Sequence, residues 1–274
     1  MFVTRFAPSP TGHLHLGHAF SALTVYEAAR AAGGRFLLRI EDSDRVRCKP
    51  EYEAAILEDL AWLGITWETP FRRQSEHMDE YQIPLQRLIE RGLVYRNFST
   101  RREAMIYSLA HAPHDAEPRF FGEPLPADEE AERIARGEVF AWRFSTARAR
   151  AALGVSALTY EDETGEHIAD PAYLGDVIIA RKDFPASYHL ASVWDDALQG
   201  VTHVIRGEDL RDSLHIHVTL RALLDLPPVI YRHHRLITDS SGRRLAKRDK
   251  DVSLASLRRE GASPREIRRR VGLE

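Results

Sequence analysis

The chain has 274 residues, of which 43% are apolar, and it carries a formal net charge of −3. This length can bury one large core, or one core with a smaller module, and the small charge argues against indiscriminate nucleic-acid binding. No stretch approaches the roughly 18 apolar residues that cross a bilayer, and no secretory signal opens the chain, which predicts a cytoplasmic protein without membrane contact. Its one cysteine, Cys48, cannot form an internal disulfide.

The first part of the chain alternates between strand and helix patterns. Residues 3–6 form a short strand pattern, a loop with two prolines and a glycine follows, and helical spacing begins near His18. Residues 35–40 then predict an apolar strand. Helical periodicity returns at 51–63 and 75–91, before a strand at 93–95. This order predicts an α/β fold with a Rossmann-type parallel sheet, which binds nucleotides at its core.

The alternation breaks after residue 95 and returns later. A capping-box pattern at Thr100 and Glu103 and short strands at 139–145, 158–160 and 177–180 predict an inserted α+β subdomain. We expect four segments: the first half of the core at 1–95, the insert at 96–185, the second half at 186–237, and a loop with a short C-terminal helical region at 238–274. The second half contains a strand at 202–205, a helix at about 212–224 and a strand that begins at Leu236. Residues 253–260 and 263–272 predict two short helices.

Two histidines flank a glycine where the first loop meets the first helix. His15 and His18 are placed to donate hydrogen bonds to phosphate oxygens, because the N-terminus of a helix attracts anions. Gly17 between them allows the backbone to approach a nucleotide closely. The alternative is a surface pair that only caps the helix.

A second polar loop lies more than two hundred residues later, at 239–248. It contains Gly242 and ends in cations, among them Arg244 and Lys247. Such a loop can fold over a triphosphate, where a lysine neutralises the charge that develops on leaving pyrophosphate. Taken alone, the segment is also typical of a basic surface turn.

Three further segments occur in order with these two, namely residues 5–12, 39–45 and 204–210. Together the five resemble bacterial glutamyl-tRNA synthetases, which are class I aminoacyl-tRNA synthetases, over nearly all of residues 1–250. Residues 15–18 are similar to the HIGH motif of that family and residues 244–248 to its KMSKS loop. Because 26 residues follow Arg248, we expect no anticodon-binding domain, as in the similar family of glutamyl-queuosine tRNA(Asp) synthetases.

The resemblance implies a ligase that uses ATP with Mg²⁺ to activate L-glutamate as glutamyl-adenylate without tRNA. It implies transfer of the glutamate to the queuosine base of tRNA(Asp), and we expect a monomer. The implied catalytic residues are His15, His18 and Lys247. The implied ATP-binding residues are Gly17, Leu236, Ile237, Arg244 and Lys247. The implied glutamate-binding residues are Arg5, Phe6, Ala7, Pro8, Ser9, Glu41, Tyr188 and Arg206.

The chemistry of these residue types fits a dicarboxylate substrate. Arg5 and Arg206 can each grip a carboxylate with two parallel hydrogen bonds, and Glu41 can hold the α-ammonium group. Glutamine would leave a guanidinium half-paired in a desolvated pocket, so we expect strong selection against it. In isolation, the carboxylates and arginines of residues 39–42 are also consistent with an ordinary ion-pair cluster.

The sequence departs from the family pattern at two places. Arg244 and Ala246 replace a lysine and a serine of the KMSKS loop, although Lys247 keeps the essential charge. Asn97 and Ser99 stand where many relatives carry the first cysteines of a zinc site, and neither supplies a thiolate. We therefore predict no structural zinc, and we expect the histidines at 111 and 114 to be solvated.

Three other functions are consistent with parts of this pattern. The first is a minimal glutamyl-tRNA synthetase that charges an acceptor end, and the second is a catalytically silent RNA-binding relative. The third is another adenylate-forming nucleotidyltransferase, such as a pantothenate synthetase, which would share the histidines but lack the segments at 39–45 and 206–210.

Overall fold

The computed structural model describes residues 1–111, 117–154, 157–181, 186–238 and 252–273. By its packing the chain divides into two compact units. The first comprises Met1–His77, Gly200–Arg211 and Val229–Glu274, and the second comprises Met78–Gln199 and Asp212–Pro228. Among the described residues, no helix is both long and apolar enough to cross a membrane.

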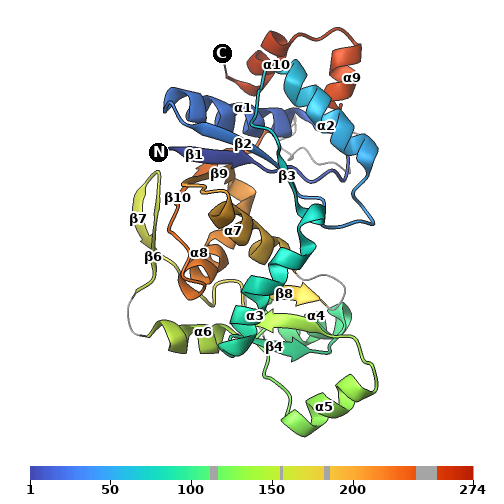
Figure 1. Ribbon diagram of the computed structural model, residues 1–274, viewed down its shortest axis with the longest axis vertical. Helices are drawn as coiled ribbons and strands as arrows, with labels where there is room; N and C mark the ends of the chain where they lie inside the picture. Colours follow the sequence, from blue (N-terminus) through green and yellow to red (C-terminus); the bar gives the residue numbers. More distant parts are fainter. Residues whose placement is uncertain (112–116, 155–156, 182–185, 239–251, 274) are drawn as a thin grey trace. The chain divides into compact units, whose positions relative to one another are not determined.

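Parallel strands form the centre of the first unit (Figure 1). The strands are β1 (Val3–Phe6), β2 (Arg35–Ile40), β3 (Arg72–Arg73), β9 (His203–Gly207) and β10 (Ile230–His234). β2 pairs with β1 on one side and with β3 on the other, while β9 pairs with β10. The backbone N–H of Thr202 donates to the carbonyl of Val3 at 2.9 Å, so β9 begins beside β1. The prediction of an α/β fold with a parallel sheet is confirmed.

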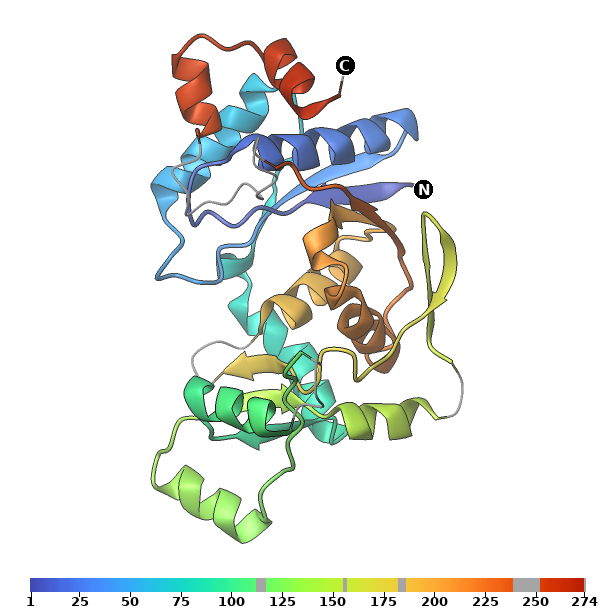
Figure 2. The ribbon, with the colours of Figure 1, turned by 180° about the vertical axis from the view of Figure 1, so that it is seen from behind.

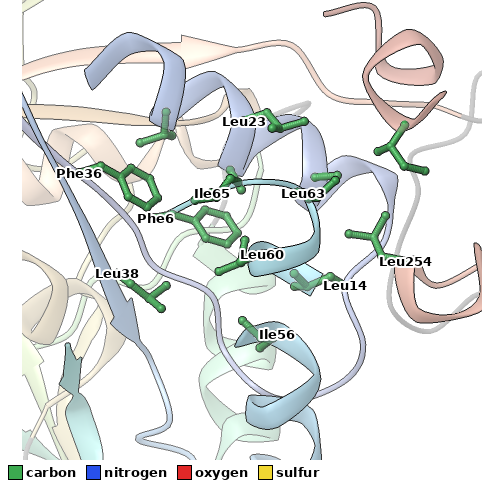
Figure 3. Close-up of a cluster of buried hydrophobic side chains, with 14 of the residues drawn as sticks. Phe6, Leu14, Leu23, Phe36, Leu38, Ile56, Leu60, Leu63, Ile65 and Leu254 are labelled. Carbon is green, nitrogen blue, oxygen red and sulfur yellow. The ribbon is translucent and has the colours of Figure 1, made fainter. Parts of the chain in front are cut away.

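The described helices of the first unit are α1 (Leu16–Ala31), α2 (Pro50–Trp62), α9 (Leu254–Arg259) and α10 (Pro264–Val271). In this unit α1 packs on the strands, α10 packs on α1, and α9 packs on α2. Two short 3₁₀ turns, η1 (Gln74–Glu76) and η3 (Glu208–Leu210), follow strands of this unit. Figure 2 shows the C-terminal helices in red beside α1 and α2 in blue. Their apolar side chains join one core with Phe6, Leu23 and Leu60, to which α9 adds Leu254 (Figure 3). Removing these side chains from water binds the C-terminal helices to the core.

An acidic side chain lies inside this core where α2 meets α9. Asp59 is fully buried, neither of its carboxylate oxygens has a hydrogen bond among the described residues, and Arg258 Nη2 lies 3.4 Å from Oδ1. Burial raises the pKa of Asp59 to about 6. The folded protein therefore keeps this proton at pH values where the unfolded chain has lost it, so this group makes the fold less stable as pH rises from about 4 to 6.

We expect the Asp59→Asn variant to gain stability relative to the parent protein by about 2 kcal/mol when the pH is raised from 4 to 7. Asparagine has the same size and no charge to desolvate. Urea unfolding at both pH values measures the difference in the free energy of unfolding. The matched control is Glu51→Gln, an exposed position on the same helix. A relative stability that does not change with pH for Asp59→Asn would contradict a buried titrating group.

The second unit contains an antiparallel sheet, a hairpin and several helices (Figure 1). The sheet strands are β4 (Val94–Asn97), β5 (Ala141–Phe144) and β8 (Ile178–Arg181), and the hairpin is β6 (Thr159–Asp162) with β7 (Gly165–Ile168). The helices are η2 (Met78–Tyr81), α3 (Gln82–Glu90), α4 (Arg101–His111), α5 (Ala127–Ala135), α6 (Thr146–Leu153), α7 (Tyr188–Leu198) and α8 (Ser213–Leu223). The Tyr81 hydroxyl donates to buried Asp195 at 2.9 Å, which ties η2 to α7.

Two predicted elements differ from the structure. The helix predicted at 75–91 is wrong in its first half, because α3 begins at Gln82 after two 3₁₀ turns. Pro84 explains the difference: in a continuous helix its ring would clash with the carbonyl of Glu80, whereas in a first turn it is tolerated. The strand predicted to begin at Leu236 is also wrong, because the strand is β10, which ends at His234.

The compact units do not follow the four predicted segments. Residues 78–95 and the helices α7 and α8 are predicted for the halves of the core, yet they pack in the second unit. Leu88, Leu190 and Ile216 share one apolar cluster with Phe144 and Ile179 of the predicted insert, which explains this grouping. The functional division at residues 95, 185 and 237 stays a prediction.

Candidate active site

Charged side chains gather at the carboxyl ends of the parallel strands in the first unit. Arg5 lies on β1 and Arg206 on β9, and both are at most 6% exposed. Glu41 follows the last residue of β2, and its N–H donates to the carbonyl of Pro8 at 3.0 Å. β1 has β2 beside it on one side and the start of β9 on the other, so the strand order reverses there. Parallel α/β sheets bind ligands at such an edge.

A buried cation fixes one oxygen of Glu41. Arg39 is completely buried, and its Nη2 donates to Glu41 Oε1 at 3.1 Å. The side chain of Glu41 retains 14% exposure. A charge-assisted hydrogen bond of this kind holds the carboxylate in one orientation at the mouth of the strand edge.

The two predicted phosphate-binding histidines cap the N-terminus of α1. His15 is the N-cap residue, and its Nδ1 accepts the N–H of Gly17 at 3.1 Å. The Nδ1 of His18 accepts the N–H of His15 at 3.2 Å. A ring nitrogen that accepts carries no proton, so each neutral imidazole carries its proton on Nε2. The first turn of α1 contains no acidic residue, which preserves the positive end of the helix dipole.

Gly17 has a structural role that the sequence interpretation did not include. A Cβ atom at this position would lie 2.9 Å from Cε1 of His15. The glycine therefore gives the His15 ring room to fold back over the helix terminus and accept from the backbone. Close approach of the backbone to a nucleotide stays a prediction.

The chain returns to this helix terminus after the predicted KMSKS-like loop. Arg244, Ala246 and Lys247 lie outside the described residues. Ser253 forms an antiparallel bridge with His15, and the N–H of Leu254 donates to the carbonyl of Leu14 at 2.8 Å. Ser253, the second described residue after the loop, is thereby held beside His15.

The predicted adenine-binding residues follow β10. A Cβ atom at Gly207 would lie 3.2 Å from the side chain of Leu236, so this glycine admits Leu236 against the end of β9. His234 Nε2 lies 2.9 Å from Ser21 Oγ, and its Nδ1 lies 2.9 Å from the carbonyl of Arg235. Burial lowers the pKa of His234 and favours its neutral form. This contact joins the end of β10 to α1, ahead of Leu236 and Ile237.

The remaining predicted glutamate-binding residues have different environments. Ala7 and Ser9 are partly exposed in the loop after β1, and Pro8 is buried. The side chain of Phe6 lies in the apolar core (Figure 3), which leaves only its backbone to face a ligand. Tyr188 is the exposed first residue of α7 in the second unit. Its place in a glutamate pocket stays a prediction.

Comparison with known proteins identifies the family. Residues 1–273 match the family model described as tRNA synthetases class I (E and Q), catalytic domain. The chain belongs to this family. Class I tRNA synthetases join an amino acid to RNA, so the prediction of a ligase of this kind is confirmed.

Similar class I synthetases fall into two named groups. A Glutamyl-Q tRNA(Asp) synthetase from Rhodobacter capsulatus is 47% identical, over 99% of this chain and 100% of the relative. A synthetase of the same name from Nocardia farcinica is 40% identical, over 96% of this chain and 81% of the relative. Glutamate–tRNA ligase 1 from Paracoccus denitrificans is 36% identical over 96% of this chain, which covers 59% of that ligase.

A solved structure shows the same fold. The glutamate–tRNA synthetase from Elizabethkingia anophelis superimposes with a TM-score of 0.76 and 29% identity. The match covers 90% of this chain and 53% of that synthetase. The Rossmann-like architecture predicted from the sequence is thus shared with a solved class I synthetase.

The region predicted to lack zinc is held by side-chain contacts. Arg143 Nε donates to Asn97 Oδ1 at 3.2 Å, and the guanidinium of Arg96 lies 4.5 Å from the ring centroid of Trp142. The described residues contain no group of three or more His, Cys, Asp or Glu side chains that fits a metal ion. His114 and the side chain of His111 lie outside the described residues.

We predict that protein purified from zinc-supplemented medium contains well under one zinc per chain and that EDTA leaves its Tm unchanged. The reason is that Asn97 and Ser99 provide no thiolate. Elemental analysis and a thermal melt measure both quantities. One zinc per chain, or a Tm lowered by the chelator, would contradict this expectation.

Sequence reasoning missed two side chains of this strand edge. Arg39 is predicted only as part of the ion-pair pattern at 39–42, and no role is predicted for the side chain of His233. His233 instead contacts Arg206, with Nε of the arginine 3.3 Å from Nε2 of the histidine. The only local signal was the alternation of Tyr231 and His233 on one face of a strand.

Proposed function

We propose that this protein activates L-glutamate with ATP and Mg²⁺, without tRNA, and transfers the glutamate to the queuosine base of tRNA(Asp). The observation that carries the proposal is the 47% identity along the full length of a Glutamyl-Q tRNA(Asp) synthetase. Glutamate–tRNA ligases match at 36–38% identity and are covered to less than two thirds of their length. The greater similarity to the Glutamyl-Q tRNA(Asp) synthetase favours transfer of glutamate to tRNA(Asp) over the charging of tRNA(Glu).

The residues at the strand edge fit recognition of glutamate. Two buried guanidiniums, those of Arg5 and Arg206, supply paired donors for the two carboxylates of the substrate. Glu41, oriented by Arg39, supplies an anion for the α-ammonium group. Tyr188 of the second unit remains a predicted member of the same pocket.

In the first step, an oxygen of the glutamate α-carboxylate attacks the α-phosphorus of ATP and the bond to the β,γ-pyrophosphate breaks. Glutamyl-adenylate and pyrophosphate result. His15 and His18 would each offer an Nε2–H to phosphate oxygens at the N-terminus of α1, and Lys247 would face the leaving pyrophosphate. These residues stabilise charge and position ATP, so no proton leaves the protein.

Mg²⁺ neutralises charge on the β- and γ-phosphates when it is bound. Mg²⁺ usually keeps several waters and binds together with substrate phosphates, so it would enter with ATP. Lys247 precedes Ser253 by six residues, and Ser253 is bridged to His15. Six peptide steps span at most roughly 22 Å, so the chain length is compatible with a Lys247 that reaches the same triphosphate as the histidines.

In the second step, a hydroxyl of the queuosine base attacks the activated carbonyl carbon. An ester bond forms, AMP leaves with the electron pair of the broken acyl–phosphate bond, and the hydroxyl proton passes to the departing phosphate. Helix α10 carries Arg265, Arg268, Arg269 and Arg270, and cations of this kind suit an RNA backbone. Two of them are already paired within the protein, Arg268 with Glu27 and Arg270 with Glu266.

Transfer of radiolabelled glutamate to purified RNA tests the proposal. The substrates are tRNA(Asp) with queuosine, the same tRNA lacking queuosine, and unmodified tRNA(Glu). We expect acid-precipitable label only on the first. Label on tRNA(Glu) would instead favour the minimal glutamyl-tRNA synthetase, and no activation of glutamate at all would favour a silent RNA-binding protein.

A further inference from the structure

Arg206 and His233 form a buried pair between neighbouring parallel strands. They are register partners on β9 and β10, and their exposed fractions are 5% and 8%. Arg206 Nε donates to His233 Nε2 at 3.3 Å. The guanidinium also lies 5.5 Å from the ring centroid of Tyr231, two residues before His233 on the same face. Two residues of β10, Tyr231 and His233, therefore contact the guanidinium of Arg206.

The pairing defines the proton on the histidine. Because Nε2 accepts from Arg206, that nitrogen carries no proton, and a neutral His233 carries its proton on Nδ1. An imidazolium would turn a second N–H toward a donor and place two cations in contact. The buried pair thus requires a neutral ring with the tautomer opposite to that of His15 and His18.

The same contact determines which side of the guanidinium grips a carboxylate. Arginine binds carboxylates with two parallel N–H groups, taken either from Nε and one Nη or from the two Nη atoms. With Nε engaged by His233, the pair of donors that includes Nε is no longer offered to a carboxylate. A guanidinium whose plane is already fixed loses less freedom when the ligand binds.

We propose that His233 is a positioning residue for glutamate recognition, acting through Arg206. The proposal rests on the proposed function, because it assigns the Arg206 guanidinium to a carboxylate of glutamate. His233 itself touches no reacting atom in this scheme. Its substitution should therefore alter the KM for glutamate far more than the KM for ATP or the kcat of activation.

Two substitutions separate positioning from packing. His233→Leu fills the space but removes the acceptor, whereas His233→Gln keeps a neutral oxygen near the position of Nε2. Hydrogen bonds to charged groups predict a KM for glutamate about 10- to 100-fold higher in the leucine variant. We expect the glutamine variant to remain within about threefold of the parent protein. Glutamate-dependent ATP–pyrophosphate exchange measures both, with circular dichroism and Tm as controls of folding.

The outcomes are distinct from those of the proposed function. If the parent protein exchanges with glutamate and the leucine variant has an unchanged KM for glutamate, the positioning role is wrong. The positioning role would also be wrong if the leucine variant raises the KM for ATP as much as the KM for glutamate. If the parent protein itself fails to activate glutamate, the proposed function fails first.

Nuclear magnetic resonance provides a test that needs no folded leucine variant. In the ¹⁵N-histidine-labelled parent protein, the His233 signals, assigned by their loss in His233→Gln, should show a protonated Nδ1 and an unprotonated Nε2 at neutral pH. A ring protonated on Nε2 would contradict the hydrogen bond to Arg206 and with it the proposal.

Discussion

The Lys247→Ala variant is expected to form glutamyl-adenylate several hundred-fold more slowly than the parent protein. Removing one preorganised charge contact to a developing anion costs about 2.7–4 kcal/mol in the transition state. Because the lysine acts on the leaving pyrophosphate, the loss should fall on kcat more than on the KM for glutamate. Single-turnover formation of glutamyl-adenylate measures the rate of this step directly.

Lys250→Ala is the matched control, since it removes the same charge three residues further along the same segment. We expect it to keep a rate within about threefold of the parent rate, because no contact with the pyrophosphate is predicted for Lys250. Equal rates for Lys247→Ala and the parent protein would show that the Arg244 and Ala246 substitutions accompany a different use of this loop.

The Arg206→Gln variant is expected to have a kcat/KM for glutamate that is about thirty- to several-thousand-fold lower. This corresponds to roughly 2–5 kcal/mol of lost transition-state stabilisation. The change removes a buried cation that is predicted to face a substrate carboxylate. Discrimination against glutamine should fall at the same time, because the neutral side chain no longer requires a charged partner. ATP–pyrophosphate exchange with each amino acid measures both effects.

The control for Arg206 is Arg232→Gln, which removes a guanidinium from an exposed position on the adjacent strand β10. It should leave both kcat/KM and the preference for glutamate unchanged. An Arg206→Gln enzyme with intact preference for glutamate over glutamine would show that other groups recognise the substrate.

Local sequence signals predicted the parallel sheet and, from about His18, the helix that begins at Leu16. Prolines and Gly12 end the first strand, and apolar residues at helical spacing define α1, so both features depend on neighbouring residues. The same holds for α9 and α10, where Ser253 and Ser263 accept backbone N–H groups as caps. The predicted histidine pair lies at a helix terminus for the same reason.

Features that depend on distant pairing could not be derived in this way. Arg206 and His233 are 27 residues apart, and only the register of β9 on β10 brings them together. The strand β7 has a glycine, a glutamate and a histidine and no apolar alternation, so only its pairing with β6 reveals it. Gly17 makes room for the His15 ring, which depends on a rotamer that sequence does not specify.

The most direct test of the account is glutamate-dependent exchange of pyrophosphate into ATP in the complete absence of RNA. We assign His15, His18, Lys247 and the buried Arg5 and Arg206 to one adenylation reaction. We therefore predict rapid exchange with glutamate and negligible exchange with glutamine or aspartate. No exchange with glutamate, or exchange only after tRNA is added, would contradict the account.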